Sequence, residues 1–135
     1  MPKLQHIADT GFLVALCDKN KEIRAKTRKL FAEVGAPMFT CEPVLTEAAH
    51  IISPRLVAKM VEDGDLKVAF DVEEHIQRVR ELIEKYADQP MDLADACLVR
   101  MSELFPSPMI YTSDQDDFNV YRRFGDKTIP CVFVG

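Results

Sequence analysis

The chain has 135 residues, of which 47% are hydrophobic and 29% are charged. This length predicts a single domain, residues 1–135, and the composition excludes the disordered and membrane-embedded classes of protein. The formal charge of −5 does not exclude a nucleic-acid partner, because the 22 acidic residues nearly balance the 17 lysines and arginines once the four acids discussed below are set aside.

Strand-like and helix-like segments alternate along the chain, with short connections between them. Residues 4–8, 38–41, 66–69, 109–112 and 131–134 have the apolar character expected of strands. Helices are expected over residues 12–17, 21–34, 43–52, 54–62, 72–86 and 92–104. This alternation predicts an α/β fold in which helices cover both faces of a mostly parallel sheet.

The sequence carries no signal for export or membrane insertion. No apolar run approaches the roughly 18 residues that a membrane span needs, and the start of the chain lacks a basic segment followed by an apolar one. We therefore expect a cytoplasmic protein with no membrane partner. Four scattered cysteines without a CxxC pair are expected to be reduced core residues: Cys17, Cys41, Cys97 and Cys131.

Two aspartates follow predicted strands. Asp9 comes directly after the strand at residues 4–8, and Asp114 comes shortly after the strand at residues 109–112. Active sites of open α/β sheets form outside the carboxyl ends of their strands. Asp9 and Asp114 are therefore candidate site residues at this edge of the sheet.

Two further acids lie in predicted helices among small or apolar residues. Glu47 shares a helix face with Val44, Ala48 and Ile51, and we expect that face to be buried. Asp95 is the single charge in an otherwise apolar stretch of helix. A buried carboxylate needs a partner or a shifted pKa, which favours a shared cation. Structural explanations for both acids stay open. Glu47 can form a salt bridge, and Asp95 can lie in the first turn of its helix, where the helix dipole favours a negative charge.

Asp92 and Asp117 are secondary candidates. Asp92 is expected to be the N-cap of its helix. Asp117 follows Asp114 closely, and it either adds to the acidic site or lies in a solvated loop. Thr10 and Thr112 stand beside the acids, where they can hydrogen-bond a ligating carboxylate or a water molecule, although threonines near strands need no functional explanation.

The candidate acids offer only oxygen ligands, which suit Mg²⁺ or Mn²⁺. Zinc is disfavoured, because His6, His50 and His75 show no metal-ligand spacing. A bound ion would orient a phosphodiester, lower the pKa of the attacking water and stabilise charge in the transition state. The expected ligands are Asp9, Glu47, Asp95 and Asp114.

Four segments, taken in order, resemble the PIN-domain family and its small VapC-type toxin branch. They are Ala8-Asp9-Thr10-Gly11-Phe12-Leu13, Leu45-Thr46-Glu47-Ala48, Leu93-Ala94-Asp95-Ala96 and Thr112-Ser113-Asp114-Gln115-Asp116-Asp117-Phe118. One departure is Gly11, because members of the family often have Ser or Asn at that place, whose side chain would hydrogen-bond to the site. The resemblance covers nearly the whole chain.

The resemblance implies a three-layer α/β/α sandwich and a metal-dependent endoribonuclease that cuts single-stranded or loop RNA. It also implies a homodimer, an antitoxin protein as partner and transfer RNA as a target. Val57, Met60 and Val61 are candidates for the dimer surface or, equally, for the domain's own core. The main alternative is a PIN-like scaffold that binds RNA or protein without cutting.

Two other classes fit the sequence less well. Asp9-Thr10-Gly11 matches the aspartic-protease triplet, but that chemistry needs a β-rich fold and a second triplet. A phosphate-accepting receiver domain needs a lysine on a late strand, and the last two predicted strands have none. Two basic groups are candidates to hold an RNA backbone or are solvated surface: Lys19, Lys21, Arg24, Lys26, Arg28 and Lys29, and Arg122, Arg123 and Lys127.

Overall fold

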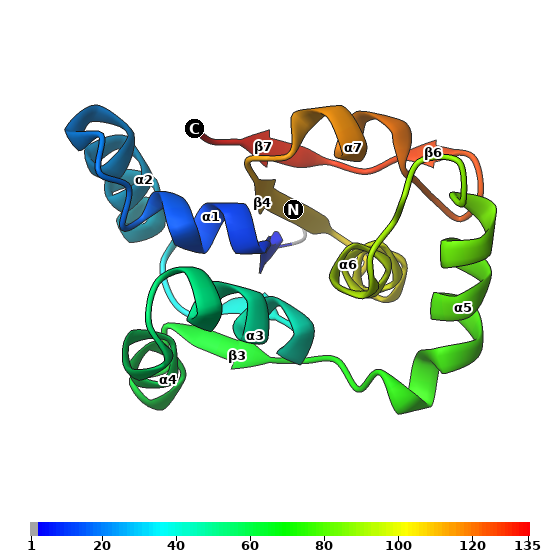
Figure 1. Cartoon of the computed structure of the whole chain (residues 1–135), viewed down its shortest axis with the longest axis horizontal. Helices are drawn as coiled ribbons and strands as arrows, with labels where there is room; N and C mark the ends of the chain where they lie inside the picture. Colours follow the sequence, from blue (N-terminus) through cyan, green and yellow to red (C-terminus); the bar gives the residue numbers. More distant parts are fainter. Residues whose placement is uncertain (1–2) are drawn as a thin grey trace.

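The computed structural model describes residues 3–135, so the first two residues of the start segment considered above, Met1 and Pro2, lie outside it. A central sheet of five parallel strands runs in the order β3-β2-β1-β4-β7. Figure 1 labels β3, β4 and β7 of this sheet, with helices around them. The strands are β1 (Gln5–Ala8), β2 (Met38–Thr40), β3 (Leu66–Val68), β4 (Pro108–Thr112) and β7 (Cys131–Phe133). Each lies within or next to a segment predicted to be a strand.

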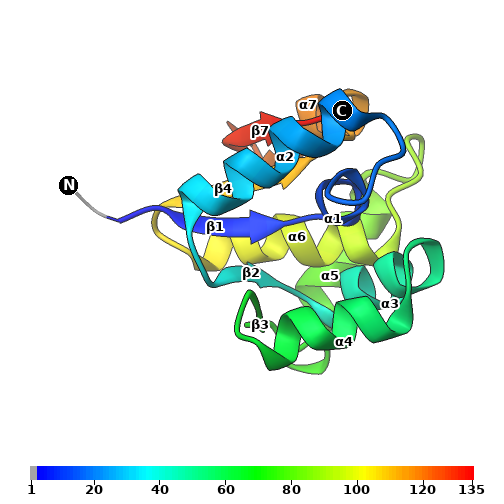
Figure 2. The same cartoon turned by 90° about the vertical axis from the view of Figure 1, so that its left-hand side faces the viewer.

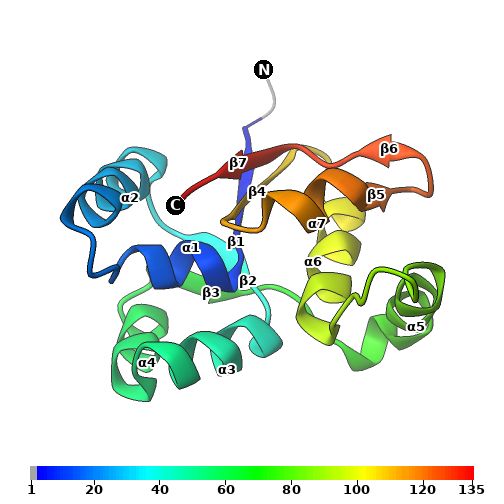
Figure 3. The same ribbon diagram turned by 45° about the horizontal axis from the view of Figure 1, so that its top comes forward.

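Helices fill most of the connections between these strands. They are α1 (Thr10–Ala15), α2 (Lys21–Val34), α3 (Glu42–Ile51), α4 (Pro54–Glu62), the 3-10 helix η1 (Glu73–His75), α5 (Ile76–Lys85), α6 (Leu93–Leu104) and α7 (Gln115–Val120). In Figure 3, α1 to α4 lie on one side of β1 and α5 and α6 lie on the other. The predicted α/β/α sandwich with a parallel sheet is therefore confirmed.

Side-chain caps and one glycine fix where several helices begin and end. The Asn20 side chain accepts a hydrogen bond from the backbone N–H of Glu22 at 2.9 Å and caps α2. The Ser53 hydroxyl accepts one from the N–H of Leu56 at 3.2 Å and caps α4. Gly35 ends α2 with φ = 79°, a conformation that only glycine adopts readily. These local signals explain why the predicted bounds of α2 and α4 agree with the structure, whereas the helix predicted over residues 12–17 begins two residues earlier, at Thr10.

The core lies between the sheet and both helix layers. Ile7 and Ile110 on neighbouring strands are fully buried, as are Phe12 on α1 and Leu98 on α6. Val57 on α4 also packs into the core, whereas Val61 stays partly exposed. The four cysteines form no disulfide: Cys41 and Cys97 are buried, and Cys17 and Cys131 are half-buried.

Three local features differ from the prediction. Residues 72–86 form η1 followed by α5 rather than one continuous helix. The polar helix α7 was not predicted, because its six residues are too few to show an apolar periodicity. Nor was the antiparallel hairpin of β5 (Arg122–Arg123) and β6 (Lys127–Thr128), whose two-residue strands carry mostly charged side chains.

The order of the strands reverses between β1 and β4. From β1 the chain moves outward to β2 and β3, and from β4 it moves the other way to β7. Such a switch point leaves a crevice outside the carboxyl ends of the two strands, where ligands bind in open α/β sheets. Figure 2 shows β1 at the middle of the molecule, with α1 beyond its carboxyl end. Asp9 follows β1 and Asp114 follows β4 at this crevice.

The helices within residues 3–135 are all too short or too polar to cross a membrane.

Candidate metal centre

Asp9 lies at the end of β1, where the strand turns directly into α1. Its backbone N–H donates to the Tyr111 carbonyl at 2.9 Å, which continues the pairing of β1 with β4. One carboxylate oxygen, Oδ1, accepts from the N–H of Thr10 at 2.6 Å, and the other, Oδ2, accepts from the Thr112 hydroxyl at 2.6 Å. The Thr10 hydroxyl donates in turn to Glu47, so the hydroxyl groups of both threonines contact a candidate acid, as expected. The Asp9 residue is only 6% exposed.

Asp95 lies in the first turn of α6 and is 8% exposed. Its backbone N–H donates to Asp92 Oδ1 at 2.8 Å, so the prediction that Asp92 caps this helix is confirmed. Its side chain accepts a hydrogen bond through Oδ2 from the buried Tyr121 hydroxyl at 2.9 Å. Tyr121 thereby fixes one oxygen of the carboxylate.

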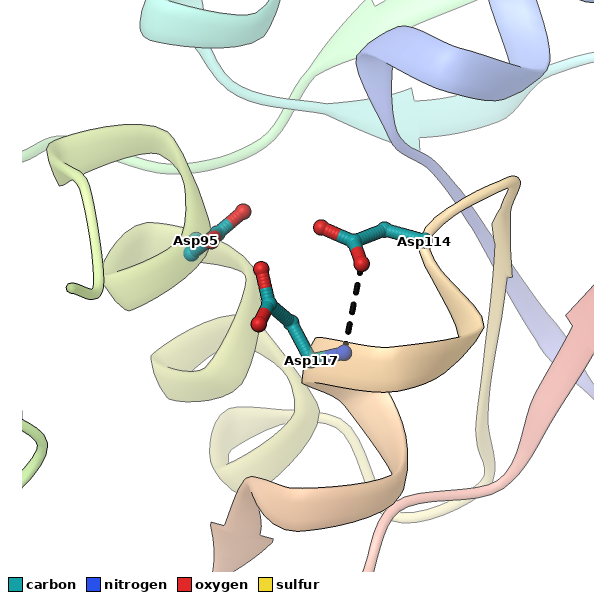
Figure 4. Close-up of side chains that lie close together, drawn as sticks. All are labelled: Asp95, Asp114 and Asp117. Atoms are coloured by element: carbon teal, nitrogen blue, oxygen red, sulfur yellow. Dashed lines mark hydrogen bonds between the residues drawn. The ribbon is translucent and has the colours of Figure 1, made fainter. Parts of the chain in front are cut away.

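Asp117 lies in the first turn of α7, and Asp114 precedes this helix, shortly after the end of β4. Asp114 caps this helix by accepting from the N–H of Asp117 at 3.2 Å, and its own N–H donates to the Thr112 hydroxyl at 3.0 Å. Asp95, Asp114 and Asp117 each offer a carboxylate oxygen, and these oxygens lie within 4.8 Å of one another. Figure 4 shows the three side chains converging from α6 and α7. Among the secondary candidates, Asp117 is thus the one that the structure brings into the cluster.

Glu47 occupies a different position from the one expected. The prediction of a buried face is correct for Val44 and Ala48, but Glu47 itself is exposed and Ile51 is 63% exposed. Glu47 Oε1 accepts a hydrogen bond from the Thr10 hydroxyl at 2.9 Å. The Glu47 side chain therefore lies at the rim of the crevice and is linked through Thr10 to the buried Asp9.

The pKa of Asp9 is raised from 3.8 to about 6, and burial is the largest cause. The hydrogen bonds from Thr112 and Thr10 act in the opposite direction. The charges of Glu47 and Asp114 raise this pKa further. Glu47 and Asp114, which belong to distant parts of the sequence, thus both act electrostatically on Asp9.

Asp95 and Asp114 respond in the same direction. Burial raises the pKa of Asp95 to about 8, the negative charge of Asp92 adds to this, and the hydrogen bond from Tyr121 opposes it. Burial also raises the pKa of Asp114, and the nearby Asp117 carboxylate adds to the effect. Neighbouring carboxylates in a poorly solvated site disfavour one another's ionised form.

Glu103 shows how the same chain stabilises a buried carboxylate for a structural purpose. Its side chain is 1% exposed and accepts two hydrogen bonds from Arg78, at 2.9 and 2.6 Å, and one from Arg100 at 3.2 Å. Burial alone would raise the pKa of Glu103, but these arginines and the N–H of Phe124 lower it overall. Within residues 3–135, neither Asp9 nor Asp95 has an ion pair of this kind.

Gly11 is the departure from the resembled family pattern, and the structure gives a physical reason for it. A Cβ atom at Gly11 would clash with the side chain of Ser113 and lie 3.0 Å from its backbone nitrogen. Ser113 follows β4, directly before Asp114. A larger residue at position 11 would therefore require the segment that carries Asp114 to move.

Two further contacts at the site were missed from the sequence. Tyr121 donates to Asp95 across 26 residues, and Gln89 Nε2 donates to Asp117 Oδ1 at 2.9 Å across 28 residues. Nothing in the spacing of these residues indicates either pair, because the pairs form only when α7 packs beside α6.

The second basic group is largely occupied in holding the fold. Arg122 Nη1 donates to the carbonyls of Asn119, Val120 and Tyr121 at the end of α7, at 2.7 to 3.2 Å. Arg123 Nη2 donates to the carbonyls of Ser102 and Phe105 near the end of α6. These guanidinium groups still contribute positive charge near α7.

No protein-family model matches this sequence, and a search of curated proteins finds no match either.

Proposed function

We propose that this chain is a metal-dependent endoribonuclease that hydrolyses RNA phosphodiester bonds, with the architecture of a PIN domain. One observation carries the proposal. Asp9, at the switch point of the sheet, and Asp95, in the first turn of α6, are buried with hydroxyl and N–H groups as partners, whereas the structural acid Glu103 has two arginines. Carboxylates kept in such surroundings without a side-chain cation are suited to a bound cation.

The oxygen donors fit Mg²⁺ or Mn²⁺. Asp95, Asp114 and Asp117 are the residues that would hold the ion, with Asp9 beside them and Glu47 at the rim of the crevice. A divalent ion bound there would supply Lewis-acid activation of water and neutralise charge on a phosphodiester.

The protein's own residues keep this site in order before any substrate arrives. Tyr121 occupies one oxygen of Asp95, and Thr112 contacts both Asp9 and the backbone of Asp114. Thr10 joins Asp9 to Glu47. Donors of this kind orient ligating carboxylates and reduce the reorganisation needed to bind an ion.

The finer parts of the proposal rest on the resemblance described above. They are that the enzyme is the toxin of a toxin–antitoxin pair, that it acts as a homodimer, and that transfer RNA is among its targets. An antitoxin would control the activity by covering the acidic crevice.

Cleavage of RNA by the purified protein tests the proposal. Total RNA and a transfer RNA pool are incubated with protein and Mn²⁺ or Mg²⁺, and the products are mapped. Discrete cuts that disappear with EDTA and in Asp9→Asn, but persist in the exposed control Asp126→Asn, are expected. Absence of metal-dependent cuts, with RNA still bound, would instead favour a non-catalytic RNA-binding scaffold.

A further inference from the structure

An open groove adjoins the candidate metal centre. Its volume is about 550 Å³, and its apolar lining includes Pro43 on α3, Val72 before η1, and Leu93 and Ala94 at the start of α6. Leu93 is 44% exposed, although it begins a helix whose following residues are mostly buried. Volumes of 300–1,000 Å³ with mostly apolar walls are typical of small-molecule sites. The groove is large enough for one nucleobase with its sugar.

The groove and the acidic site share residues. Glu47 lines the groove and is joined through Thr10 to Asp9, and Asp92 lines it while capping the helix that carries Asp95. A nucleotide whose phosphate lies at the candidate metal centre therefore has its base within reach of the groove. This step rests on the proposed function.

The polar side chains of the groove are three carboxylates and Thr46, whose hydroxyl donates to the backbone carbonyl of Glu42 at 3.2 Å. The three carboxylates differ in the number of hydrogen bonds that they accept. Glu47 accepts from Thr10, and Asp92 accepts from the N–H of Asp95. Within residues 3–135, the Glu42 side chain has neither a hydrogen-bond partner nor an ion pair. Glu42 is exposed in the first turn of α3, beside Pro43. It is the carboxylate with both oxygens available to a ligand.

We propose that this groove binds a guanine base next to the cleaved phosphodiester, with Glu42 as the residue that reads it. A carboxylate only accepts hydrogen bonds. Guanine presents two adjacent donors, N1–H and the 2-amino group, on one edge. Adenine and cytosine place a ring-nitrogen acceptor beside their amino group, and uracil places carbonyls on both sides of its N–H. Two carboxylate oxygens therefore match guanine, while the apolar wall packs against its flat faces.

Charge explains why a base, rather than a phosphate, occupies the groove. Glu42, Glu47 and Asp92 would repel a phosphate that is not neutralised by a cation. A neutral base with hydrogen-bond donors meets no such repulsion. Sequence-specific readers of single-stranded RNA commonly bind unstacked bases in this way.

Substrate analogues test the base. The cleavage site is first mapped, and short RNAs are then made with guanine, inosine, adenine or uracil at each nucleotide flanking the cut. We expect kcat/KM to fall roughly tenfold to a hundredfold when guanine at one flanking position is replaced by adenine or uracil, and by less with inosine, which lacks the 2-amino group. Equal rates for all four bases at both positions would overturn the proposal.

Matched variants test the residues. Glu42→Gln should reduce the preference for guanine, while Glu81→Gln, an exposed acid on α5, should not. Leu93→Ala should raise KM roughly fivefold through lost apolar contact. Leu104→Ala is its control, because Leu104 lies at the other end of the same helix and is 40% exposed. Equal effects of Leu93→Ala and Leu104→Ala, or a changed oligomeric state in Leu93→Ala alone, would contradict a base site.

Binding separates this inference from the proposed nuclease activity. Fluorescein-labelled RNA pentamers with one central guanine, inosine or adenine are titrated with protein in Ca²⁺, and anisotropy is measured. A guanine preference that Glu42→Gln removes supports the groove even if no RNA is cut. Cleavage without such a preference supports the nuclease and overturns the groove.

Discussion

Replacement of Asp95 by Asn should make the metal-free protein more stable at alkaline pH than the wild type. Burial and the charge of Asp92 raise the pKa of Asp95 from 3.8 to about 8. The folded state therefore binds the Asp95 proton more tightly than the unfolded state. The stability that this proton contributes is lost as the pH rises from about 4 to about 8. Asn has no such proton to lose.

The magnitude follows from the size of the pKa shift. Each unit corresponds to about 1.4 kcal/mol, so the full shift sets an upper limit of roughly 6 kcal/mol. Coupling of the Asp95 titration to those of Asp9 and Asp114, together with water at the crevice, reduces the contribution below this limit. We expect the free energy of unfolding of Asp95→Asn, relative to the wild type, to increase by ~2 kcal/mol between pH 5 and pH 9.

Urea denaturation in EDTA at pH 5, 7 and 9 measures this difference, with Asp126→Asn as the control. Asp126 lies in the exposed β5–β6 turn, so its variant should follow the wild type at every pH. In thermal scans the same change corresponds to a shift of about 6–8 °C for a domain of this size. If the difference in stability between Asp95→Asn and the wild type is the same from pH 5 to pH 9, the pKa of Asp95 is not raised by burial and neighbouring carboxylates.

Two further predictions concern hydrogen bonds. Tyr121→Phe keeps the buried ring but removes the hydroxyl that donates to Asp95. We expect the variant to lose about 1 kcal/mol of stability and to bind Mn²⁺ more weakly. Unchanged Mn²⁺ affinity in a fluorescence titration would show that this hydroxyl does not orient the carboxylate. Glu103→Gln weakens the contacts with Arg78 and Arg100, and we expect it to cost about 2 kcal/mol at pH 7. The pKa of Glu103 is lowered on folding, so its ionised carboxylate stabilises the folded protein above the pKa of the unfolded state, and this stabilisation is lost as the pH falls through the folded-state pKa. The loss of stability in Glu103→Gln, measured by urea denaturation, should therefore become smaller in acid. A loss that does not depend on pH would be inconsistent with this ion pair.

Local signals made much of the fold predictable. Asp92 was expected to cap its helix because a cap depends on residues within one turn, and the structure agrees. Gly35 likewise marks the end of α2. The parallel sheet followed from the alternation of apolar segments, whose order and connection lengths leave few other arrangements.

Contacts between distant segments could not be predicted. Tyr121 reaches Asp95 because the end of α7 packs against α6, and Gln89 reaches Asp117 because the loop before α6 lies against α7. Neither Tyr121 nor Gln89 has a local sequence pattern that marks it. The position of Asp117 in the acidic cluster depends on α7, which is too short to recognise from periodicity.

Glu47 shows a limit of helical periodicity. The spacing correctly groups Val44 and Ala48 on one buried face. It does not say where the edge of that face reaches solvent, and Glu47 lies at this edge, in contact with Thr10. The sequence thus predicted that Glu47 lies near the crevice, but it did not predict that its side chain is exposed.

Mn²⁺ binding to the purified protein, followed by the electron paramagnetic resonance signal of the free ion, tests most directly whether these carboxylates form a metal centre. We predict saturable binding by the wild type and by Asp126→Asn, and its loss in Asp95→Asn. If Asp95→Asn and the wild type remove the same amount of free Mn²⁺ from solution, the cluster of Asp95, Asp114 and Asp117 is not a metal site.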